Sequence, residues 1–143
     1  MTVDSELCIT SEMENLEAIS DFVASVAKEL GLDEDQTFAL QMAVDEACSN
    51  IIEHAYGGRR DGIISVCCQV ADEDVVITIR DKGRPFDPQS VPRPDVTAPL
   101  EERVNGGLGL HLMEKLMDSV EWEFDSELGN TLTMRKHRGN PTV

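Results

Sequence analysis

Apolar positions along the chain repeat with two different periods. Residues 6–10 form a short apolar run that predicts a strand, and Ser11 with Glu14 then has the spacing of a capping box at a helix start. A helical apolar stripe follows and ends before Gly31, which suits a left-handed helix-terminating residue. A second helix is expected from about residues 33–35 to Tyr56. The stripe of the first helix comprises Leu16, Ile19, Phe22, Val23, Val26 and Leu30.

After Gly57 the apolar period changes from 3.6 to 2. Alternation over residues 64–70 and 75–79, on either side of an acidic turn, predicts a hairpin. A third helical stripe starts near Leu108, and residues 120–125 and 132–134 predict a second hairpin. This order predicts an α+β two-layer sandwich, with helices on one face of a mixed, mostly antiparallel sheet. We expect a single domain over residues 1–143, with a lid formed by the proline-rich stretch at residues 82–107.

Composition narrows the possible partners. The chain has 143 residues and a formal charge of −16, with 28 acidic against 12 basic residues. The negative electrostatic field of such a chain argues against nucleic acid or an anionic membrane as the main partner and favours a basic partner protein. The sequence shows no apolar stretch of membrane-spanning length and no signal peptide at its start, so we expect a cytoplasmic protein. The four cysteines lack metal-ligand spacing and are expected to be reduced and mostly packed.

Three polar residues of the second helix share one face. Glu46, Asn50 and His54 follow one another at four-residue intervals and form a nearly continuous ridge. Apolar residues flank this ridge, as they do where polar groups line a cleft. A solvated stripe, with His54 near the helix end, is the alternative interpretation.

Two glycine-containing segments could approach a nucleotide. Asp81 follows an interior strand, where its carboxylate could accept a hydrogen bond from an exocyclic amine and favour adenine over guanine. Gly83 would let the backbone come close to a flat ring, although the same residues could simply form a turn. Residues 106–109 open the third helix, where free N–H groups can bind phosphate. A flexible hinge is the alternative there, because the residues fit neither a P-loop nor a dinucleotide fingerprint.

Together, these three modules resemble the nucleotide site of the ATPase superfamily shared by gyrase, the Hsp90 chaperone, sensor histidine kinases and MutL. Within it, the chain is most similar to the anti-sigma-factor serine/threonine kinases of bacterial partner switching. The similarity runs from Leu7 to His137, and the matching segments are residues 45–56, 81–88, 106–110 and 129–136.

The resemblance implies a protein kinase that binds ATP and Mg²⁺, sequesters a sigma factor and phosphorylates an anti-sigma-factor antagonist. It assigns Glu46 as the catalytic base, Asn50 as the metal ligand and Asp81 as the reader of adenine. The remaining nucleotide contacts would come from Gly83, Gly107, Leu108, Gly109 and Thr131, with Thr131 as a hydroxyl near Asp81. A homodimer is possible.

Two other functions fit the same motifs. One is an ATP-dependent binding module without phosphotransfer, and the other is the catalytic domain of a sensor histidine kinase. The acidic charge also requires local compensation for ATP, from Mg²⁺, from the helix end at Leu108, and from some of Lys82, Arg84, Arg93 and Arg103.

Overall fold

A five-stranded sheet forms one layer of the protein. The computed structural model describes residues 4–85 and 105–138. Its strands are β1 (Asp4–Thr10), β2 (Ile63–Ala71), β3 (Asp74–Asp81), β4 (Ser119–Asp125) and β5 (Gly129–His137). They lie in the order β1-β2-β3-β5-β4, and all four pairings are antiparallel. The described sheet is therefore antiparallel throughout, rather than mixed.

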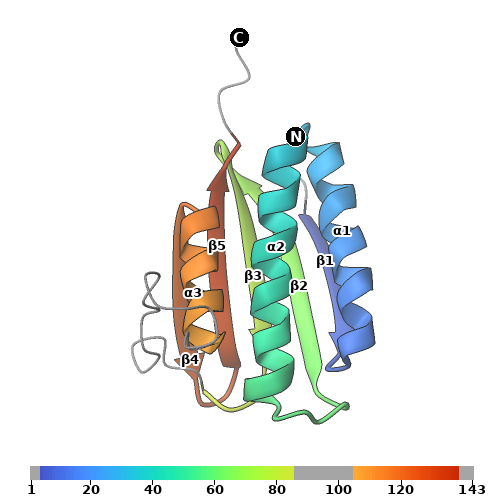
Figure 1. Ribbon diagram of the computed structural model, residues 1–143, viewed down its shortest axis with the longest axis vertical. Coiled ribbons are helices and arrows are strands. Elements are labelled where there is room, and N and C mark those ends of the chain that lie inside the picture. The colour runs from blue at the N-terminus through green and yellow to red at the C-terminus, as the bar shows by residue number, and fades with distance from the viewer. Residues whose placement is uncertain (1–3, 86–104, 139–143) are drawn as a thin grey trace.

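Three helices form the other layer. They are α1 (Leu16–Glu29), α2 (Glu34–Asn50) and α3 (Asn105–Leu116), and the π-helical turn η2 (Ile51–Ala55) continues α2. Figure 1 shows all three on the same face of the sheet, with α2 between α1 and α3. The predicted two-layer sandwich is confirmed. Most of the predicted lid, residues 86–104, lies outside the described residues.

The core fills the space between the two layers. Alternate strand residues face the helices and are almost fully buried, as the period of 2 predicts. They meet buried positions of α1 and α2, and burying such apolar area contributes about 25 cal/mol per Å². The inner face of the sheet includes Ile64, Val66, Cys68, Ile77, Ile79, Leu132 and Met134.

The cysteines and the membrane prediction can be checked in part. Cys48 and Cys68 are buried, Cys67 is half-buried and Cys8 is exposed, and none of the four is in a disulfide. Burial raises the pKa of the Cys68 thiol to about 12, which keeps this thiol protonated and packed as an apolar group. Among the described residues, no helix is long and apolar enough to span a membrane.

The start of the first helix differs from the prediction. The buried Ser11 hydroxyl donates to the Arg59 carbonyl and accepts from the Gly62 N–H, so it does not cap the helix. A 3₁₀ turn, η1 (Met13–Asn15), leads into α1 instead. The capping box that forms is the one at α2, between Asp33 and Gln36. The end of α1 is as predicted, since Gly31 has a φ of +76°.

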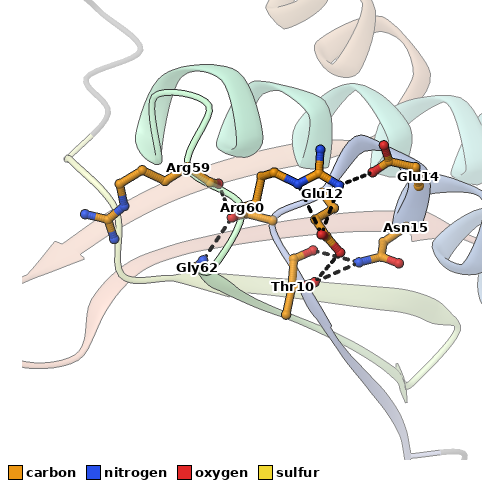
Figure 2. Close-up of polar contacts among 8 residues, drawn as sticks. Thr10, Glu12, Glu14, Asn15, Arg59, Arg60 and Gly62 are labelled. Carbon is orange, nitrogen blue, oxygen red and sulfur yellow. Dashed lines mark hydrogen bonds and ion pairs between the residues drawn. The ribbon is translucent and has the colours of Figure 1, made fainter.

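Ser11 belongs to a polar corner, defined as Thr10–Asn15 together with Arg59–Gly62. Figure 2 shows the Arg60 guanidinium between the carboxylates of Glu12 and Glu14, with nitrogen–oxygen distances of 3.1 and 3.5 Å. On the other side, the Asn15 amide donates to the Thr10 carbonyl and hydroxyl. The corner therefore fixes the end of β1 to the loop that leads into β2.

We predict that Ser11→Ala lowers the free energy of unfolding by about 1–3 kcal/mol. The substitution leaves the Gly62 N–H and the Arg59 carbonyl without their buried partner. Ser49→Ala is the matched control, because within the described part of the chain the Ser49 hydroxyl bonds only to the Glu46 carbonyl of its own helix, and alanine favours helix. Urea denaturation of both variants measures the effect. Equal stability of the two variants would contradict a stabilising role for Ser11.

Candidate nucleotide site

A cavity opens where α2, β3 and β5 meet. It has a volume of about 450 Å³, including open solvent. Its lining residues lie where α2 and β3 end and β5 begins. These ends of the three elements are at the lower end of the molecule in Figure 1. Its walls are mainly apolar, with polar groups from α2, η2, β3, β4 and β5. The lining residues are Ala47, Asn50, Ile51, His54, Ala55, Asp81, Trp122, Glu123, Asn130 and Leu132.

Asp81 is the buried charged group of this cavity. Its side chain is at the end of β3, and the residue is only 5% exposed. The Oδ1 atom accepts hydrogen bonds from the Gly83 N–H and from the Asn130 amide, both at 2.8 Å. Burial raises the pKa of the Asp81 carboxyl, and these two hydrogen bonds only partly oppose that effect. The second oxygen, Oδ2, has no donor among the described residues.

Gly83 allows the chain after β3 to pass close to the end of α2. A Cβ atom at this position would lie 2.5 Å from the Ala55 carbonyl oxygen, so no other residue fits without a backbone shift. The next residue, Arg84, donates its N–H to the Ala55 carbonyl and its guanidinium to the His54 carbonyl, both at 2.8 Å. Lys82 donates its N–H to the Tyr56 hydroxyl. These contacts hold residues 82–84 against the helix end.

Those carbonyls lie in the last turn of the helix, where carbonyls have no intrahelical donor, and this turn is π-helical. Within η2 the Tyr56 N–H bonds to the Ile51 carbonyl, five residues back instead of four. The carbonyls of His54 and Ala55 accept from Arg84 instead of from the helix. This irregular turn was not predicted, because a single π turn of five residues is too short to show as a change in the apolar period.

Of the three polar residues predicted on one ridge, the structure places two in the cavity. Asn50 and His54 line it, whereas Glu46, one turn earlier on α2, is not among the lining residues. Glu46 is half-buried, and its pKa is raised by burial first and then by the negative charges of Asp45 and Glu53. The Asn50 amide has no hydrogen-bond partner among the described residues, so it is available to a ligand.

The prediction that Thr131 lies near Asp81 is wrong. Thr131 pairs with Arg80 across the sheet, and paired residues point to the same face, so Thr131 faces away from the helices. Asn130 is the residue opposite Asp81, and its amide contacts the carboxylate. The apolar alternation of β5 could have indicated this contact, because Asn130 lies on the same face of the strand as the buried Leu132 and Met134. Trp122 and Glu123 also line the cavity and were not predicted.

The predicted phosphate-binding glycines lie in the first turns of α3, since this helix begins at Asn105 and includes Gly107, Leu108 and Gly109. The last residue of α3, Leu116, accepts a hydrogen bond from the Lys136 ammonium at the far end of β5. The start of α3 therefore lies at the cavity end of the molecule (Figure 1). Of the four cations considered for phosphate, Arg93 and Arg103 lie outside the described residues.

Comparisons with known proteins agree with this geometry. The family model described as a histidine kinase-like ATPase domain matches residues 9–136. The chain is 37% identical to the serine-protein kinase RsbW of Bacillus pumilus over 142 residues, which cover 94% of this chain and 86% of that protein. It is 31% identical to the serine-protein kinase RsbW of Bacillus subtilis over 142 residues, covering 96% and 88% of the two chains.

The fold has a solved counterpart. A crystal structure of the RsbU and RsbW domains of a Mycobacterium tuberculosis protein matches with a TM-score of 0.71 at 18% identity. The match covers 98% of this chain and 34% of that chain, so this chain spans about a third of the longer protein. At this identity the likeness concerns the fold.

We predict that Asp81→Asn is more stable than the wild type at neutral pH. The raised pKa of Asp81 means that the folded protein pays for a buried charge whenever the carboxyl is ionised. Asparagine keeps an acceptor oxygen for Gly83 and Asn130 without that charge. The gain should shrink as the pH falls through the raised pKa, because the wild-type carboxyl then becomes neutral.

Thermal or urea unfolding of variant and wild type between pH 7.5 and 4.5 measures this difference. Asp21→Asn, at an exposed position of α1, is the matched control and should show no such trend. A variant that is less stable than the wild type at pH 7.5 would contradict the assignment of burial as the dominant effect.

Proposed function

Because the chain belongs to the family of histidine kinase-like ATPase domains, we propose that it is an ATP-dependent protein serine/threonine kinase and an anti-sigma factor. In this function it sequesters a sigma factor and phosphorylates an anti-sigma-factor antagonist. The observation that carries the proposal is the buried Asp81, whose Oδ2 has no described donor, in an apolar cavity beside Asn50. The relatives named serine-protein kinase RsbW support the choice of reaction.

The nucleotide would place its base in the apolar part of the cavity. Asp81 would accept a hydrogen bond from the 6-amino group, and Gly83 would let the backbone approach the ring. The walls suit a flat aromatic base, since Ala47, Ile51 and Leu132 line them. The phosphates would lie toward Asn50 and the first turns of α3, where Gly107, Leu108 and Gly109 offer backbone N–H groups and the positive end of the helix dipole.

Asn50 would hold Mg²⁺ through its side-chain oxygen. Mg²⁺ prefers oxygen ligands and keeps several waters, so one protein oxygen together with phosphates is a sufficient ligand set. In the described part of the chain, no cluster of three or more acidic, histidine or cysteine side chains could hold a metal ion by itself. When bound, the ion neutralises phosphate charge.

Glu46 would orient and deprotonate the attacking serine hydroxyl. The pKa of Glu46 is raised, which moves it toward neutral pH, and a general base is most effective when its pKa lies near the working pH. Because Glu46 lies one turn from Asn50, outside the cavity lining, an incoming protein substrate could reach it from the side. The same position favours a second candidate, a non-catalytic module that binds partners according to its nucleotide.

The proposal also covers the domain organisation, the partners and the cellular location of the protein. Residues 1–143 would act as one ATPase domain. The lid predicted at residues 82–107 can begin only after Arg84 and end only before Asn105, because residues 82–84 are held against the helix end and α3 begins at Asn105. The charge of −16 suits a basic surface on the sigma factor and opposes direct binding to nucleic acid or an anionic membrane. Since sigma factors act on the transcription machinery, the site of action would be the cytoplasm. A homodimer is compatible with this arrangement.

The proposal predicts a separation of effects on α2. Glu46→Ala should bind ATP within about threefold of wild type yet lose at least 10²-fold in phosphotransfer, because a base acts in the transition state. Asn50→Ala should lose both Mg²⁺-dependent binding and transfer. The assay is transfer from labelled ATP to the serine of a candidate antagonist, with acid-stable label, and Glu17→Ala, at an exposed position of α1, as control.

If Glu46→Ala transferred phosphate at the wild-type rate, the catalytic role of Glu46 would be wrong. If wild-type protein bound ATP without any transfer, the non-catalytic module would be the better description.

The adenine assignment predicts a preference for ATP over GTP. Guanine presents a carbonyl where adenine has its amine, and this oxygen would face the Asp81 carboxylate, so we expect discrimination of about 10²-fold or more. Calorimetric titration with each nucleotide and Mg²⁺ measures it. Asp81→Asn should weaken ATP binding and reduce the preference, whereas Asp21→Asn should change neither. Equal affinity of the wild type for both nucleotides would refute the assignment.

A further inference from the structure

Asn130 has no role in the function proposed above, yet it makes more polar contacts than any other side chain described at the cavity. It lies at the start of β5, opposite Asp81, and is 8% exposed. Its Nδ2 atom donates to Asp81 Oδ1 at 2.8 Å, to the Arg84 carbonyl at 3.0 Å and to the Gly83 carbonyl at 3.3 Å.

These partners fix the orientation of the Asn130 amide. All three are acceptors, so the amide nitrogen, not the oxygen, must face them. Rotating the amide by 180° would place an oxygen against a carboxylate and two carbonyls. The contact to Asp81 is also charge-assisted and is the shortest of the three. The amide therefore acts as a donor toward Asp81 and the two residues that follow Lys82.

This donor determines how the Asp81 carboxylate is turned. The torsion that rotates a carboxylate about its bond to Cβ has broad preferences, so the aspartate alone does not select one orientation. Here one oxygen, Oδ1, receives both the Gly83 N–H and the Asn130 amide. With Oδ1 occupied twice, Oδ2 is the oxygen left for a ligand.

The same amide also sets the position of the backbone that follows β3. Asn130 holds Gly83 and Arg84 from the side of β5, while the carbonyls of His54 and Ala55 hold Arg84 from the side of α2. The segment is thus fixed between two elements. The distance between the carboxylate and the ring-contacting backbone at Gly83 depends on both.

We propose that Asn130 is a positioning residue for nucleobase specificity, which aims Oδ2 of Asp81 at the 6-amino group of the base. This inference rests on the proposed adenine site and adds to it a residue that acts through Asp81. A residue with this role changes discrimination at the amino group, whereas a residue with a purely structural role changes stability and affinity for all nucleotides alike.

The test compares ATP with purine riboside triphosphate, which carries hydrogen in place of the 6-amino group. Calorimetric titration with Mg²⁺ gives the ratio of their dissociation constants. A hydrogen bond to a charged group is strong enough that we expect wild-type protein to prefer ATP by about tenfold or more. Asn130→Ala should reduce that ratio at least fivefold, toward unity.

Two further variants keep the test decisive. Asn130→Ser, which retains one short donor, is expected to fold even if the alanine variant does not and to give an intermediate ratio. Asn15→Ala is the matched control, because Asn15 also donates its amide to a backbone carbonyl (Figure 2) and is not among the residues that line the cavity. Its ratio should stay within twofold of wild type.

The outcomes separate this inference from the function on which it rests. A wild-type ratio near unity would overturn the adenine assignment of Asp81 itself. A clear wild-type preference that both Asn130 variants retain within twofold would overturn only the positioning role of Asn130. A fall in the ratio for the Asn130 variants, but not for Asn15→Ala, supports it.

Discussion

The arrangement of the cavity depends on one buried carboxylate. Placing an ionisable group at the end of a central strand costs free energy, because burial disfavours its charged form. Two donors partly offset this cost, the Gly83 N–H and the Asn130 amide, and both are directed at one oxygen. Those donors require a glycine close to α2 and an asparagine opposite Asp81 in the sheet. The carboxylate thus constrains three elements at once.

The end of α2 is the second feature that holds the segment after Asp81. The carbonyls in the last turn of any helix have no intrahelical donor. Here the helix ends in a π turn at Ile51–Ala55, and the carbonyls of His54 and Ala55 accept from Arg84. Irregular turns of this kind are frequent at functional sites, and here the turn joins the helix to the segment after Asp81.

An acidic protein that binds an anionic nucleotide needs local compensation. Screening reduces the influence of distant charges, with a Debye length of about 8 Å at physiological salt. The first turns of α3 bring backbone N–H groups to the cavity end of the molecule, and Lys82 and Arg84 follow Asp81 directly. The overall charge therefore concerns the partners of the protein more than its nucleotide.

Sequence patterns alone determined the architecture. Each α-helix and strand in the described part of the chain was predicted, because the core selects apolar residues with the period of the element that carries them, and the antiparallel β2–β3 and β4–β5 pairings follow from the two hairpins. Asp81 and Asn50 were also found from sequence, since a carboxylate after an apolar strand and an amide on a helix among apolar neighbours stand out from their surroundings. The glycines beside Asp81 and at the start of α3 were visible in the same way.

Only the tertiary structure decided which polar groups meet. Ser11 looked like a helix cap, but the loop before β2 supplies a buried partner for its hydroxyl that no local pattern reveals. Asn130, and not the predicted Thr131, contacts Asp81. Strand register determines which face of the sheet a residue occupies, and a shift of one residue reverses that face. Glu46 lies outside the cavity lining while His54 lies within it, a difference that helical spacing could not show. Local periodicity is a property of neighbours in sequence, whereas these contacts join residues about 50 positions apart.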